Sequence, residues 1–125
     1  MKYHDFQLES YSVCDFGKKI TLHLIFDYPN SPKEKSTIEF TDVIAYHFIH
    51  IGSTIITDID EISIAKLLEK FGSNLLEWSC QHGGLKFLDK DLSVYKTKLE
   101  NEGYKSWSIE SAIGFEGFVI AKSVK

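Results

Sequence analysis

The stretch from Asp60 to Trp78 places the strongest constraint on how this chain can fold. Its large apolar residues recur at steps of three and four, the spacing that lines one side of an α-helix. They are Ile64, Leu67, Leu68, Phe71, Leu75 and Trp78, with Ala65 and Leu76 beside them. We expect Asp58 or Asp60 to cap the first turn, because a carboxylate accepts hydrogen bonds from free backbone N–H groups. Gly83-Gly84 should end the helix.

Most of the other segments are typical of β-strands, since β-branched and aromatic residues alternate with polar ones. The predicted strands are Tyr3–Cys14, Ile20–Tyr28, Thr37–Thr41, Ile44–Ile51, Thr54–Ile59, Lys105–Ser111 and Phe118–Val124. The alternation breaks within the first of them, which indicates a bulge or an edge position. Gly52-Ser53 is typical of a tight hairpin turn, and Ile113-Gly114 should also turn the chain.

The segment Asp91–Glu102 is compatible with two structures. Asp89 or Asp91 as a cap and Gly103 just past the end favour a helix. The alternation of Tyr95, Thr97 and Leu99 would instead suit a short strand. Short connections favour antiparallel pairing. We therefore predict one α+β domain over residues 1–125, with a largely antiparallel sheet of about seven strands packed against one long amphipathic helix and a second helix.

Charge and composition narrow the function classes. The net charge is −4 and the cations are not clustered, which argues against nucleic acid as a partner. The apolar runs are much shorter than the ~20 residues of a membrane span, and no secretory leader is evident at the start. We expect a cytoplasmic protein with Cys14 and Cys80 reduced, although the sequence leaves a bridge between them open.

No group of polar residues forms a recognisable reactive motif. On a strand, His47 and His50 point to opposite faces, so they should not bind a metal together. Asp58, Asp60 and Glu61 are explained by helix capping. Cys80 and His82 supply too few ligands for a structural zinc site. We therefore predict no catalytic residue, no cofactor and no metal.

The aromatic residues are the candidates for binding, because they are too many for one face of a small sheet and interfaces are enriched in them. We select Tyr11, His47, Trp107 and Phe115 as the predicted binding surface. A non-enzymatic protein-interaction module is the first hypothesis. The alternative is a small-molecule-binding protein or enzyme, with His23, His47 or His50 in a pocket between sheet and helix. A homodimer is also possible.

The end of the chain resembles the C-terminal part of small bacterial proteins grouped with the immunity proteins of polymorphic toxin systems. The residues that carry the resemblance are Tyr104, Trp107, Ile109, Ser111, Gly114, Gly117, Val119 and Ala121-Lys122. The resemblance covers about a quarter of the chain and includes no catalytic motif. It implies a protein that binds and neutralises a cognate toxin without chemistry of its own, and it transfers no functional residue.

Overall fold

The computed structural model describes residues 3–83 and 85–125 and has an α+β fold. The elements are β1 (Gln7–Cys14), the 3₁₀ turn η1 (Asp15–Gly17), β2 (Lys19–Phe26), β3 (Glu34–Thr41), β4 (Ala45–Ile62), α1 (Ile64–His82), α2 (Leu92–Asn101), β5 (Lys105–Ala121) and β6 (Ser123–Val124). The expected fold class is confirmed. The described residues form a sheet of six strands rather than about seven.

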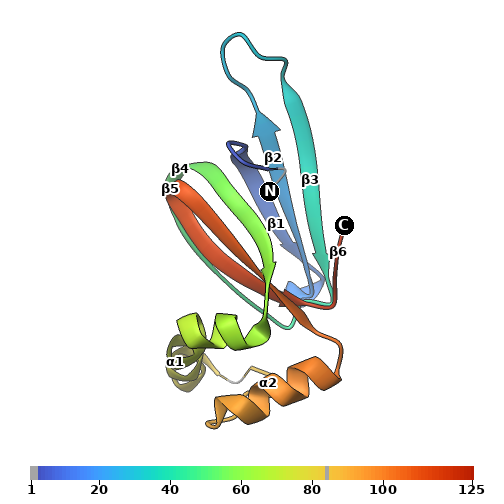
Figure 1. The fold of residues 1–125 in the computed structure, drawn as a ribbon, viewed down its shortest axis with the longest axis vertical. Coiled ribbons are helices and arrows are strands. Elements are labelled where there is room, and N and C mark those ends of the chain that lie inside the picture. Colours follow the sequence, from blue (N-terminus) through green and yellow to red (C-terminus); the bar gives the residue numbers. More distant parts are fainter. Residues whose placement is uncertain (1–2, 84) are drawn as a thin grey trace.

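The sheet is antiparallel, has the order β5-β4-β1-β2-β3-β6, and curls into a half-barrel with the helices at one end (Figure 1). The edge strands β5 and β6 follow each other in the chain. Between them, the N–H of Lys122 donates to the carbonyl of Thr41 on β3, at 3.2 Å. One C-terminal segment therefore links both edges of the curled sheet. The predicted irregularity in β1 is confirmed as a register shift between Leu8 and Ser10.

Strands β4 and β5 are long and continuous, so two predicted turns are wrong. Both halves of β4 pair with β5, so Gly52-Ser53 is not the turn of a hairpin. The register runs from His50 opposite Phe115 to Ile55 opposite Ile113, which leaves residues 51–54 of β4 opposite Gly114. A wide bulge therefore replaces both turns, and Figure 1 shows both strands bending sharply there.

Two apolar cores lie on opposite faces of the β4–β5 ribbon. The inner core fills the half-barrel and contains Phe6, Ile20, Leu22, Leu24, Ile38, Phe40, Val43, Ile56, Ile59, Trp107, Ile109, Phe115, Val119 and Ala121. The outer core joins the ribbon to the helices and contains Ala45, Ile64, Leu67, Leu68, Leu75, Tyr95, Leu99, Phe118 and Ile120. The apolar stripe that predicted α1 thus packs on the sheet, as its spacing required.

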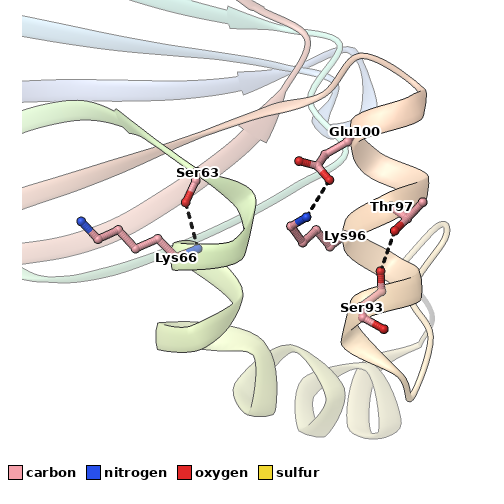
Figure 2. A network of polar contacts seen from close by, with 6 residues as sticks. All are labelled: Ser63, Lys66, Ser93, Lys96, Thr97 and Glu100. Atoms are coloured by element: carbon pink, nitrogen blue, oxygen red, sulfur yellow. Dashed lines mark hydrogen bonds and ion pairs between the residues drawn. The ribbon is translucent and has the colours of Figure 1, made fainter.

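The predicted N-terminal cap of α1 is wrong, whereas that of α2 is confirmed. Asp58 and Asp60 belong to β4, and Ser63 caps α1 by accepting a hydrogen bond from the N–H of Lys66 at 3.1 Å (Figure 2). Gly83 follows α1 with φ of 104°; Gly84 lies outside the described residues. The helical alternative for Asp91–Glu102 is confirmed, with Asp91 as the cap of α2.

Polar contacts along α2 support that helix from its solvent side (Figure 2). The Lys96 ammonium donates to the Glu100 carboxylate at 3.0 Å, and the Thr97 hydroxyl donates to the Ser93 carbonyl at 2.9 Å. Exposed pairs four residues apart contribute only about 0.3–0.5 kcal/mol. The packing of Tyr95 and Leu99 in the outer core therefore holds α2 in place.

Tyr95 provides a test of that core. Its side chain is fully buried, and its hydroxyl has no hydrogen-bond partner within the described structure. Replacing Tyr95 by Phe removes an unpaired buried polar group, so we expect the free energy of unfolding at pH 7 to rise by about 1 kcal/mol. Urea unfolding measures this change, and a clear loss of stability would show that the hydroxyl is paired.

The same substitution has a pH signature. Burial raises the pKa of Tyr95 from 10.0 to about 12, because the folded state disfavours the phenolate. Tyr95 therefore holds its phenol proton more tightly in the folded state than in the unfolded chain. The free energy of unfolding keeps its full value below pH 10 and falls as the pH rises through about 12. We expect Y95F to lose less stability than the wild type over this alkaline range.

Candidate interaction surface

The structure divides the four predicted binding residues among three places. Tyr11 and Phe115 belong to one aromatic cluster inside the half-barrel, with ring centroids 5.9 Å apart. Phe48 and His50 complete that cluster. Phe115 is only 5% exposed, so its role as an exposed contact is wrong.

Trp107 is likewise a core residue, 5% exposed, and its ring packs edge-on against Phe40 at 5.4 Å. Its position on the inner face of β5 explains the burial. Trp107 is therefore not an exposed surface residue, and only a small part of its side chain is accessible.

His47 lies on the opposite face of β4 from His50, as the strand period required. Its ring stacks on Trp78 of α1 with centroids 4.1 Å apart, whereas the His50 ring contacts Tyr11. Burial lowers the pKa of His47, and the negative charge of Glu116 partly opposes that shift. His47 therefore helps to dock α1 on the sheet.

Within the part of the chain that the structure describes, the polar side chains considered above do not come together in a reactive cluster. Cys14 and Cys80 are free thiols, both exposed. Within residues 3–83 and 85–125, no group of three or more His, Cys, Asp and Glu side chains is placed to hold a metal ion.

A cavity of about 500 Å³ does lie between α1 and the sheet, but its lining differs from the one expected for a small-molecule site. The lining residues are Ile62, Lys66, Glu69, Lys70, Ser108 and Glu110. His23 instead faces a separate shallow cavity beside Lys35, and His47 and His50 contact different cores. The predicted histidine-lined pocket is therefore not formed by the described residues.

The feature that sequence reasoning missed is the exposure of Phe16 in the turn between β1 and β2. Asp15, Phe16 and Gly17 adopt successive positive φ angles of 52°, 56° and 89°. This conformation costs roughly 1–2 kcal/mol for a residue with a side chain, and it is unusual for a bulky one. Phe16 is nonetheless fully exposed, at 102% of its reference area. Two backbone hydrogen bonds brace the turn, from Lys18 to Asp15 at 3.0 Å and from Val43 to Lys18 at 2.9 Å.

Phe16 belongs to a group of exposed apolar residues that we name the turn patch: Val13, Phe16 and Tyr46. They come from the end of β1, from η1 and from the start of β4. The Tyr46 ring lies against Gly17, because a Cβ built on that glycine would be 3.8 Å from the ring. Asp15 is exposed in the same turn as Phe16, and Asp42 is exposed in the connection between β3 and β4. Neither forms an ion pair with another described residue. The turn patch is therefore apolar with carboxylates beside it.

A second exposed group, the corner patch, comprises Ile49, Ile51 and Ile113 at the bend of the β4–β5 ribbon. Ile51 is the most exposed of them, at 84%. These residues line a cavity of about 400 Å³ together with Glu110 and Glu116, and Glu116 pairs with Lys70 at 3.4 Å. The bulge explains their exposure, because it carries the bend away from both cores.

The residues that resemble immunity proteins have structural explanations. Trp107, Ile109, Val119 and Ala121 fill the inner core. A Cβ on Gly117 would lie 2.4 Å from the carbonyl oxygen of His47, so that strand pair requires a glycine. These five residues therefore build β5, and none of them belongs to the turn patch or the corner patch.

Comparison with known proteins adds no further information, because no protein-family model, curated protein or solved structure matches this chain. In the described part of the chain, neither helix has the length and apolar character needed to cross a membrane. The chain is thus an α+β protein with a curled antiparallel sheet.

Proposed function

We propose that this chain is a non-enzymatic protein-interaction module that binds its partner through the turn patch. One observation carries the proposal. The Phe16 side chain is fully exposed, and Phe16 is the middle one of three consecutive residues with positive φ. Stability alone would favour glycine or asparagine at this position. An aromatic ring held in solvent at a cost to stability supports a role in binding, since aromatic anchors dominate protein interfaces.

The partner that suits this surface is a protein with an apolar pocket rimmed by cations. Phe16 would fill the pocket, and Asp15 and Asp42 would face the cations. The net charge of −4 favours encounter with a basic partner, and such steering affects the association rate more than the final affinity. The more specific form that we propose is an immunity-type protein that binds and neutralises a toxin domain in the cytoplasm, because blocking a toxin requires a surface and no chemistry.

Co-purification from the native host tests the proposal. The tagged wild-type chain should recover one partner in stoichiometric amount, and Phe16→Gly should recover little of it. Two matched controls remove other exposed apolar side chains: Ile51→Thr in the corner patch and Val94→Thr on α2. Both should recover the partner as the wild type does.

Three outcomes would contradict the proposal. They are a wild-type chain that binds nothing, a Phe16→Gly chain that recovers the same partner, and an Ile51→Thr chain that alone loses it. Self-association that depends on Phe16, detected by light scattering at micromolar concentration, would instead identify a homodimer. For the immunity form, the recovered protein should have a toxic activity that the wild-type chain blocks and Phe16→Gly does not.

A further inference from the structure

A separate cavity, which we name the rim pocket, lies between the two sides of the curled sheet. Its volume is about 360 Å³, and its lining comprises Tyr3, Ile38, Ile59, Asp60, Glu61, Trp107, Val124 and Lys125. Strands β3 and β6 supply one wall, and β4 and β5 supply the other. Cavities of about 300–1,000 Å³ are typical of small-molecule sites. The size therefore suits a small ligand and not a folded partner.

The floor of the rim pocket is apolar and firmly held. Ile38, Ile59 and Trp107 are 3%, 2% and 5% exposed, so most of each side chain is packed in the inner core. The Trp107 ring packs edge-on against the Phe40 ring, which stabilises its position. A floor of this kind favours an apolar ligand body.

The rim has one carboxylate, that of Glu61, on the same face as the apolar floor. Glu61 stands opposite Trp107 in the β4–β5 register, and alternation along β4 places it on the same face as Ile59. Asp60 comes just before Glu61, and the same alternation places its side chain on the opposite face of β4. Neither carboxylate forms an ion pair with any residue in 3–83 or 85–125, whereas Lys125 contributes one positive charge to the lining. The apolar floor and the Glu61 carboxylate, which has no ion-pair partner among the described residues, together specify the ligand chemistry.

We propose that the rim pocket binds a small amphiphilic amine, with its apolar body on Trp107 and its ammonium group facing Glu61. A charge-assisted hydrogen bond to a carboxylate is stronger than one between neutral groups. A neutral or anionic molecule of the same shape would gain the apolar contacts and lose this hydrogen bond. This site is distinct from the turn patch and does not depend on the function proposed for it.

The test uses 2-phenylethylamine as the probe, with 2-phenylethanol as its neutral analogue and 3-phenylpropionate as an anion. The chain contains two tryptophans, so two-dimensional NMR separates the indole N–H signals of Trp107 and Trp78. We expect the amine to shift the Trp107 signal saturably and leave Trp78 unmoved. The alcohol should bind about tenfold more weakly, and the anion more weakly still.

Glu61→Gln keeps the shape of the rim and removes its charge, so the amine should bind about five- to tenfold more weakly to this variant. Glu110→Gln is the matched control, because Glu110 is an exposed carboxylate of the same ribbon outside the rim pocket. Phe16→Gly should leave amine binding unchanged. The proposal is overturned if the Trp107 signal does not saturate, if amine and alcohol bind equally, or if Glu61→Gln behaves like Glu110→Gln.

Discussion

Replacing Gly114 by Ala should lower the free energy of unfolding by about 3 kcal/mol or more. The backbone of Gly114 has φ of +79°, and an added Cβ would lie 2.1 Å from the carbonyl oxygen of Ser53. The conformation alone costs roughly 1–2 kcal/mol for a residue with a Cβ. The collision adds to this cost because the opposing atom belongs to backbone and cannot move aside without disturbing the bulge. Urea unfolding with unchanged slope measures the loss.

Gly52→Ala is the matched control for that substitution. Gly52 lies in the same bulge on the other strand, and a Cβ there would meet nothing within 4 Å. We therefore expect the control to change stability by less than about 0.5 kcal/mol. Equal effects at the two glycines would show that the bulge does not have the register described here.

Phe16→Gly should weaken partner binding by about 100-fold or more while leaving the fold intact. Truncation of an aromatic anchor at an interface commonly costs about 2–4 kcal/mol of binding free energy. The same change relieves the positive φ of residue 16, so the free energy of unfolding should rise by up to about 1 kcal/mol. Calorimetric titration of the recovered partner and urea unfolding of the free chain measure the two effects.

Phe16→Tyr provides the control for this second prediction. It keeps the ring and the backbone strain, so binding should fall by less than about tenfold. A Phe16→Gly chain that unfolds more easily than the wild type would contradict our account, because it would give Phe16 a structural role. Equal binding by Phe16→Gly and Phe16→Tyr would equally exclude the ring as an anchor.

The helices could be predicted well from sequence because their signals are local. The stripe from Ile64 to Trp78 required a helix with one buried face, and Asp91 capped the second helix as expected. The start of α1 was misplaced because Asp58, Asp60 and Ser63 are all acceptable caps. The choice among them depends on how far β4 extends, and its pairing with β5 is a long-range contact that local sequence does not encode.

The turns predicted at the bend of the ribbon are wrong for a related reason. A glycine inside an alternating segment is compatible with a turn, a bulge or a close backbone approach. The sequence predicts a turn at each of Gly52 and Gly114, whereas the two strands place these glycines together in one bulge. Only the register of β4 against β5 distinguishes these possibilities.

The binding surface was the least predictable part. The number of aromatic residues indicated that some must be exposed, but periodicity could not identify which. Trp107 and Phe115 point toward the inner core, whereas Phe16 lies in the connection between the predicted strands Tyr3–Cys14 and Ile20–Tyr28. Its exposure follows from positive φ at residues 15–17, which no sequence motif predicts for a phenylalanine.

The most direct test of the central claim is amide hydrogen exchange of the chain with and without its recovered partner. We expect the partner to slow exchange in residues 13–18 and around Tyr46, where it covers the turn patch. Exchange in α2 and in the corner patch should stay unchanged. Protection confined to other segments, with residues 13–18 exchanging as fast in the complex as in the free chain, would contradict the account.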